Sequence, residues 1–147
     1  ASDGGDPSAI AFPRALPDRR HHFSFSGLKT SVMTYIDKAE RSGDLAPLAD
    51  VAASLQEAIV DVLVQKTMNA VEDTGAEVVG GGGGVLANRR LREKLAERCA
   101  DRGDELYLPT PELCTDHGAM IGAAAVHWLD KNIISSWDAV VDPGRTL

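Results

Sequence analysis

The amino-acid sequence predicts an α/β fold, with helices packed on the faces of a sheet. Short apolar segments of strand length alternate with longer amphipathic segments of helical period, and a run of glycines joins one strand to the helix after it. The 147 residues, 44% of them hydrophobic, suffice for one unit with a core of its own. We therefore expect an ordered chain whose elements can be assigned in turn.

The N-terminal part combines an extended segment, a strand and a helix. Residues 1–22 are rich in glycine and proline, which predicts an extended segment. Residues 23–26 alternate phenylalanine and serine, as in a short strand with both rings on one face. A helix is expected over about residues 28–40, with Ser26 as a candidate cap. Lys29 is a candidate phosphate contact, although a core strand turning into a helix explains the same pattern equally well.

The middle of the chain contains the most regular helical pattern. Pro47 suits the first turn of a helix, where its missing N–H costs nothing, and apolar residues then recur every three or four positions until about Gly75. Residues 77–79 form a short strand that leads into the glycine run at residues 80–84. A helix over residues 88–100, apolar on one side and charged on the other, follows the run.

The last third adds one strand and one helix. Residues 105–108 form the strand, and two prolines then mark a rigid turn. Thr115 or Asp116 can cap a final helix. Residues 132–147 are expected to form a C-terminal tail. Small residues on one face of the final helix predict very close packing against a neighbour: Gly118, Ala119, Gly122, Ala123 and Ala124.

Ligands of open α/β sheets bind at the carboxyl ends of the strands. The turns over residues 79–88 and 108–116 both follow strands, so we expect them to share one edge of the sheet. In the first turn, glycines allow the backbone to approach an anion, and helix N–H groups can donate to it. Asn88 offers an acceptor and a donor to a ribose or an acyl group. A flexible connector is the alternative interpretation of so many glycines.

Charged and metal-binding side chains give weaker indications. Asp116 at the start of a helix is, by its spacing, a cap. Beside His117 it could also bind a metal, but one carboxylate is not a metal site and the chain contains no His-x-x-x-His pair. Cys114 fits a packing role. A basic group, usually a solvated helix face, is the best local candidate for an RNA contact: Arg89, Arg90, Arg92 and Lys94.

Composition argues against several classes of protein. The net charge of −7 is unsuited to a general polyanion-binding surface. Two cysteines outside a Cys-x-x-Cys pair favour a reducing, cytoplasmic location. No apolar run approaches the roughly 20 residues that span a bilayer, so no membrane partner is expected.

Four motifs, in order along nearly the whole chain, resemble those of the tRNA N6-adenosine threonylcarbamoyltransferase family, formerly called O-sialoglycoprotein endopeptidase or glycoprotease. The motifs are Gly-Asp-Pro at residues 5–7 with Phe-Pro-Arg at 12–14, Phe-Ser-Phe-Ser-Gly-Leu-Lys-Thr at 23–30, Gly-Gly-Val-x-Ala-Asn-Arg-Arg-Leu-Arg at 83–92, and Pro-Glu-Leu-Cys-Thr-Asp-x-Gly-Ala-Met-Ile at 111–121. The resemblance implies the C-terminal portion of a two-lobed actin-like ATPase (ribonuclease H-like) fold, with residues 23–131 as a partial second lobe.

The resemblance also implies an activity, the transfer of a threonylcarbamoyl group from threonylcarbamoyl-AMP to N6 of the adenine beside the anticodon of tRNA, together with partner subunits. Asn88 resembles the family's substrate-nucleotide contact, and Gly83 and Gly84 resemble its phosphate loop. Asp116 resembles its ligand to a divalent metal, iron or zinc, which two histidines of a His-x-x-x-His motif in the first lobe complete. That motif is absent here, so we expect an incomplete metal site and no transferase activity from this segment alone.

The sequence departs from the family pattern at three places, and two alternatives to a transferase stay open. The glycine run is longer than the usual two or three, Leu86 stands where a small residue is common, and His117 stands where asparagine is common. A non-catalytic remnant that binds a nucleotide or pairs with a related subunit is the main alternative to a transferase. A metalloprotease is a weaker alternative, because no glutamate general base accompanies a zinc-binding histidine pair.

Overall fold

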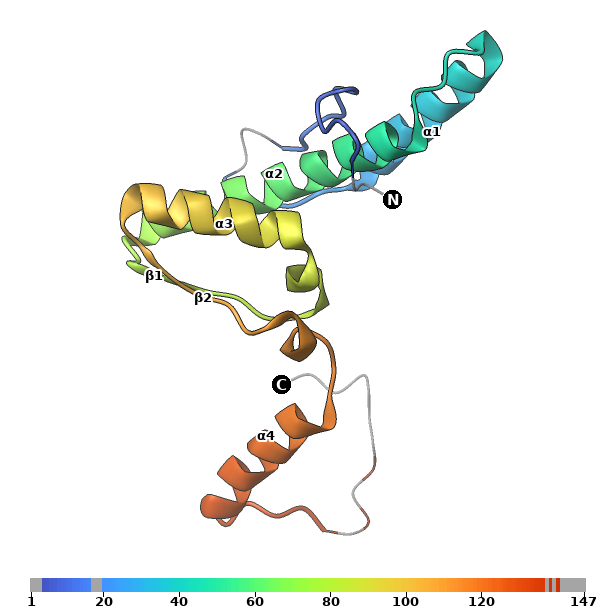
Figure 1. Ribbon diagram of the computed structural model, residues 1–147. Coiled ribbons are helices and arrows are strands. Elements are labelled where there is room, and N and C mark those ends of the chain that lie inside the picture. Colours follow the sequence, from blue (N-terminus) through green and yellow to red (C-terminus); the bar gives the residue numbers. More distant parts are fainter. Residues whose placement is uncertain (1–3, 17–19, 137, 139, 141–147) are drawn as a thin grey trace.

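The computed structural model describes residues 4–16, 20–136, 138 and 140, so much of the predicted tail at 132–147 lies outside the described residues. Its elements, in chain order, are α1 (Ser26–Ser42), α2 (Leu48–Thr74), β1 (Val78–Gly80), the 3-10 helix η1 (Gly84–Ala87), α3 (Arg89–Arg102), β2 (Glu105–Tyr107), the 3-10 helix η2 (Pro111–Leu113) and α4 (Gly118–Asp130). The predicted α/β class is confirmed at this level: within the described residues, four α-helices accompany a two-stranded parallel sheet (Figure 1).

Helix α2 contributes to both halves of the core. Its buried residues extend along its whole length, and Gly75 ends it in the left-handed conformation, with a φ of 66°. Its N-terminal half packs with α1 and with the N-terminal segment. The Ser54 hydroxyl holds that segment, because it accepts from the Ile10 N–H at 3.1 Å and donates to the Asp6 carbonyl at 3.2 Å. Residues 4–16 thus lie along α2 without regular secondary structure.

The main core lies between α2, α3 and the sheet. Asn88 and Gly103 bound α3 as a side-chain N-cap and a left-handed C-cap. The two strands are only three residues long, so side-chain packing rather than an extended ladder holds the sheet on the helices. The buried members of this core are Val60, Val64, Met68, Val71, Val79, Leu86, Leu91, Leu95, Cys99 and Cys114.

The strand predicted over residues 23–26 is wrong. Residues 23–25 are irregular and α1 begins at Ser26, which is therefore the first helical residue and not the cap. Phe25 holds the N-cap position without a side-chain hydrogen bond, and both phenylalanine rings are exposed. An alternating pattern forms a stable strand only where a neighbour pairs with it, and the sheet of the described residues contains β1 and β2 alone.

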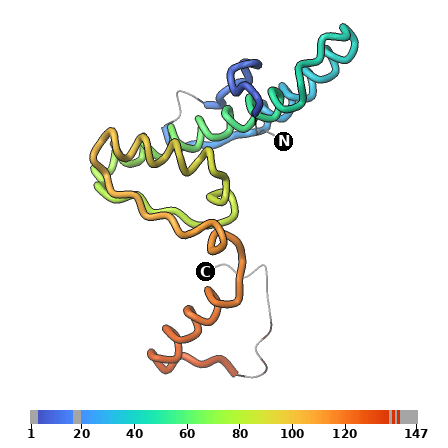
Figure 2. Tube along the Cα trace, in the orientation of Figure 1, coloured from blue at the N-terminus to red at the C-terminus, as the bar shows by residue number. Residues whose placement is uncertain are grey.

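Helix α4 lies apart from the core (Figure 1, Figure 2). The predicted close packing is wrong for the described residues: none of its residues is buried, and a Cβ at Gly118 or Gly122 would have nothing within 4 Å. Its cap is His117, whose Nδ1 accepts the N–H three residues on at 3.2 Å, in place of Thr115 or Asp116. None of the helices that the structure describes has the length and apolar character that crossing a bilayer requires.

Candidate functional site

The two loops expected to share a sheet edge do so. Strands β1 and β2 run in parallel, so the glycine run and residues 108–116 both leave the carboxyl edge. Figure 2 shows the two traces running side by side along the strands. The Gly81 N–H donates to the Tyr107 carbonyl at 3.1 Å and carries the pairing one step beyond β1.

The glycine run forms a hydrogen-bonded turn. Gly83 has a φ of 90° and a ψ of 164°, a conformation that is nearly restricted to glycine, and its carbonyl accepts the Leu86 N–H at 3.0 Å. A Cβ at Gly81 would lie 2.5 Å from a methyl group of Leu86, which therefore packs directly over this glycine. A Cβ at Gly82 or Gly84 would meet nothing within 4 Å. The outer side of the turn is thus open to a ligand.

Asn88 joins the start of α3 to α2. Its Oδ1 accepts the Leu91 N–H at 3.0 Å and its Nδ2 donates to Gln56 Oε1 at 3.0 Å. A carboxamide has two donor hydrogens and two acceptor lone pairs, so each end of the group keeps the capacity for one more hydrogen bond. The fold orients Asn88 without exhausting it, and its contact with a nucleotide stays a prediction.

A cavity of about 260 Å³ lies beside Asn88. Apolar side chains of α2 form one wall, Val85 and Leu91 contribute to the other, and the amide groups of Gln56 and Asn88 add polar atoms. Apolar walls with a few convergent polar groups are typical of pockets for small organic ligands. The sequence alone does not single out Gln56, because one polar residue within an amphipathic helix carries no distinctive signal.

The basic group at the start of α3 is not simply a solvated face, so that interpretation is wrong in part. Arg90 donates to both carboxylate oxygens of Glu57 at 2.9 and 3.0 Å, and Lys94 pairs with Glu57 and Asp61 of α2. Hydrogen bonding from Arg90, with further bonds and charge from Lys94, lowers the pKa of Glu57 to about 2. Arg89, with 82% of its side chain exposed, pairs with Glu93.

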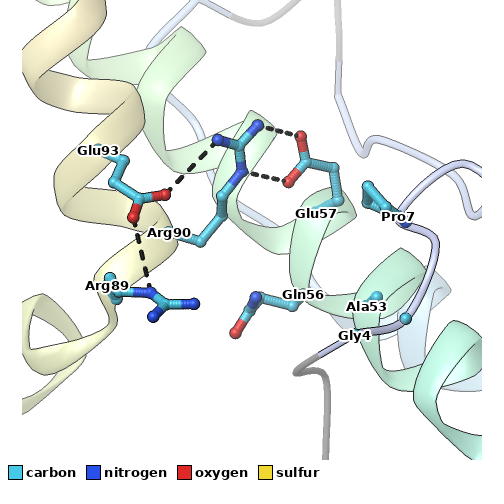
Figure 3. Close-up of a pocket in the computed structure, with 9 residues that line it drawn as sticks. Gly4, Pro7, Ala53, Gln56, Glu57, Arg89, Arg90 and Glu93 are labelled. Carbon is cyan, nitrogen blue, oxygen red and sulfur yellow. Dashed lines mark hydrogen bonds and ion pairs between the residues drawn. The ribbon is translucent and has the colours of Figure 1, made fainter.

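A second cavity, also about 260 Å³, lies between the N-terminal segment, residues 53–57 of α2 and the first turn of α3 (Figure 3). Backbone of Gly4 and Gly5 forms one side, and two arginines and two glutamates lie on the other. Figure 3 shows the Arg90 guanidinium directed at the carboxylate of Glu57, with Glu93 on its other side. Because the charges in this cavity balance, it offers no net attraction for a polyanion, which leaves the RNA contact a prediction.

Asp116 does not by itself provide a metal site. It is exposed in the loop before α4, and the Nδ1 atom of neighbouring His117 is engaged as the helix cap. The described residues contain no group of three or more histidine, cysteine, aspartate or glutamate side chains that could hold a metal ion. One carboxylate is too small a donor set for iron or zinc, so these residues do not fit such a metal without ligands from elsewhere. Cys114 is buried in the core, as its packing role requires.

Known proteins resemble this chain over most of its length. The model of the family described as TsaD, tRNA N6-adenosine threonylcarbamoyltransferase, matches residues 1–123. A tRNA N6-adenosine threonylcarbamoyltransferase of Corynebacterium diphtheriae is 51% identical over 82% of this chain and 37% of its own length. Its counterpart in Geotalea uraniireducens is 46% identical over 91% of this chain and 39% of its own length. The chain thus spans less than two fifths of these relatives, and it belongs to the tRNA N6-adenosine threonylcarbamoyltransferase family.

Proposed function

We propose that this chain supplies the nucleotide-facing part of a transferase that moves a threonylcarbamoyl group from threonylcarbamoyl-AMP to N6 of the adenine beside the anticodon of tRNA. The observation that carries the proposal is the open glycine turn next to Asn88 and its apolar cavity, at the carboxyl edge of a parallel sheet. The chain would then be the C-terminal part of a two-lobed actin-like ATPase fold. Partner subunits would complete the assembly.

The residues of this chain would act by binding and orientation. The cavity beside Asn88 would hold the adenine of the AMP group, the free capacity of the Asn88 amide would bind base or ribose, and the backbone at Gly83 and Gly84 would approach the phosphate. Fixing the acyl phosphate in this way favours attack by the N6 amine on the carbamoyl carbon. The new C–N bond replaces the C–O bond to phosphate, the amine loses a proton, and AMP leaves.

Asp116 enters the proposal as one ligand of an iron or zinc ion whose other ligands lie outside the described residues. A carboxylate suits either metal as a ligand. No step of the reaction is derived through the metal, because Asp116 alone does not define its position. Asp116→Asn should therefore lower metal affinity in an assembly that contains the remaining ligands, as measured by metal content after dialysis, and equal metal content in the two proteins would contradict this role.

Titration of the chain with AMP tests the nucleotide site. Wild type should bind saturably, and Gly84→Ala should weaken binding at least about tenfold, because a new methyl group obstructs approach to the backbone. The unfolding midpoint should stay unchanged, since that methyl group meets nothing in the fold. Gly27→Ala, another open position but one in α1, is the matched control and should bind AMP like wild type.

Absence of saturable AMP binding by wild type, or equal binding by Gly84→Ala, would overturn the proposed site. The chain alone is expected to form no threonylcarbamoyl-adenosine, and formation of that product would show that the chain needs no further lobe. Binding without turnover even in a complex with partner proteins would favour the non-catalytic remnant.

A further inference from the structure

Arg92 of α3 contacts both loops that leave the carboxyl edge of the sheet. Its Nη1 donates to the Leu86 carbonyl at 3.1 Å, and its Nη2 donates to the Pro109 carbonyl at 2.8 Å. Nη1 also lies 3.7 Å from the Sγ of Cys114. Leu86 ends the glycine turn, whereas Pro109 and Cys114 belong to the segment that leads to Asp116. One side chain therefore joins two loops that are distant in sequence.

The position of Arg92 on α3 adds a third connection. Its backbone N–H donates to the Asn88 carbonyl at 3.2 Å, so it lies one helical turn after Asn88. The guanidinium group is planar and presents its donors in a fixed fork, which sets the direction of each acceptor relative to the other. A lysine at this position would keep the charge but could not hold two carbonyls in one plane.

Backbone pairing alone holds the two loops together only over a short distance. The ladder between β1 and β2 has three residue pairs and ends with the bond from Gly81 to Tyr107. Beyond that point Leu86 and Cys114 are buried in the same core, and apolar packing of this kind is not directional. The two bonds from Arg92 add directional contacts between the loops beyond the end of the ladder.

We propose that Arg92 is a positioning residue: its guanidinium group acts as a clamp that fixes the glycine turn and the Asp116 segment relative to each other. Its significance for the reaction rests on the proposed function, because the two loops carry the phosphate-facing backbone and the carboxylate of that site. The clamp itself rests on the contacts of Arg92 alone. The two statements can therefore fail separately.

Amide hydrogen exchange of the whole chain tests the clamp without any ligand. Arg92→Met should raise exchange about tenfold or more at both residues 82–88 and residues 110–116, whereas the middle of α2 should exchange as in wild type. Arg92→Lys should give an intermediate result in both loops. Arg98→Met is the matched control, because Arg98 lies exposed on the same helix, and it should change neither loop. A rise in one loop only, in neither, or uniformly across α2 and α3 would overturn the proposal.

Exchange in the presence of AMP distinguishes a positioning residue from a residue that only stabilises the fold. In wild type, AMP bound at the glycine turn should also slow exchange at residues 110–116, and in Arg92→Met this distant protection should disappear while protection at residues 82–88 persists. Persistence of the distant protection in Arg92→Met would overturn the positioning role. Failure of AMP to protect even the glycine turn of wild type would instead overturn the proposed function, and the ligand-free exchange would still decide the clamp.

Discussion

Helices α3 and α4 begin in similar ways but are held very differently. Each follows a loop from the same sheet edge, and each is capped by the side chain of the preceding residue, Asn88 or His117. Most residues of α3 are charged, yet it buries three side chains, whereas α4 has one acidic residue and buries none within the described part of the chain. Apolar character therefore does not determine burial; a facing surface of matching period does.

The polar side of α3 is part of this difference. Arg90 and Lys94 reach Glu57 and Asp61 on α2, so both the apolar and the charged side of α3 find partners on the same neighbouring helix. Removing one partner of such a partly buried pair is costly, because the remaining charge is left without its counterion. In α4, by contrast, the described contacts of large side chains are local, such as the packing of His127 on Trp128.

Truncation of one leucine in each helix should give the largest contrast. Leu95 is 6% exposed and Leu129 is 55% exposed. Leu95→Ala removes core contacts and should lower the free energy of unfolding by about 3 kcal/mol, whereas Leu129→Ala should change it by less than about 0.5 kcal/mol. Urea denaturation of both variants measures the two effects. Equal losses would mean that α4 is packed as tightly as α3.

Glu57→Gln should give the next largest effect, at about 2 kcal/mol near neutral pH. The pKa of Glu57 is about 2 in the folded chain, below its ordinary value of 4.5. The ion pairs therefore stabilise the fold fully above pH 4.5, and this contribution is lost as the pH falls from there through about 2. Between these pH values the free energy of unfolding, measured by urea denaturation, should fall less steeply with decreasing pH in the variant than in wild type.

Glu93→Gln is the control for this prediction. Its side chain is 48% exposed, and its carboxylate lies 3.6 Å from Arg89 and 3.8 Å from Arg90. Exposed pairs at such distances contribute little, so we expect a change below about 0.5 kcal/mol. If the free energy of unfolding falls as steeply with decreasing pH in Glu57→Gln as in wild type, other carboxylates cause the acid transition.

Local patterns predicted the elements well and long-range contacts poorly. The bounds of α2 follow from apolar spacing and from Gly75, which ends it. The helix expected over residues 88–100 is α3, at Arg89–Arg102, and the shared loop edge follows from parallel strands. The pairing of Arg90 with Glu57 joins residues 33 positions apart, and the charge pattern of one helix contains no information about it. The alternation at residues 23–26 was misleading for the same reason, because a strand depends on a neighbour that its own sequence does not specify.

The features of the candidate site also differ in whether local sequence or long-range contacts determine them. The glycine turn could be located from the sequence, since glycine is a local requirement of such a backbone. Asn88 is expected as a ligand contact, which stays a prediction, and the structure shows it as the cap of α3. The cavity beside Asn88, the contribution of Gln56 and the bridge made by Arg92 could not be located from the sequence, because each depends on how α2, α3 and the loops meet. The metal-binding role of Asp116 came from the family resemblance alone and stays a proposal.

Two glycine substitutions should give smaller effects than Leu95→Ala and Glu57→Gln, and with opposite signs. Gly83 has a φ of 90°, so Gly83→Ala forces a side chain into a strained conformation and should lower the free energy of unfolding by about 1.5 kcal/mol. Gly122 lies inside α4 with open space around it. Gly122→Ala should therefore favour the helix by up to about 1 kcal/mol, because alanine loses less backbone entropy.

The two variants need different measurements because their helices are coupled differently to the core. Gly83→Ala should shift the urea midpoint of the whole chain, since η1 carries the buried Leu86. Gly122→Ala should leave that midpoint almost unchanged and instead slow amide exchange within residues 118–130, by up to about fivefold for 1 kcal/mol. A clear rise of the urea midpoint in Gly122→Ala would show that α4 unfolds together with the core, and the contrast between α3 and α4 would then be one of surface exposure but not of stability.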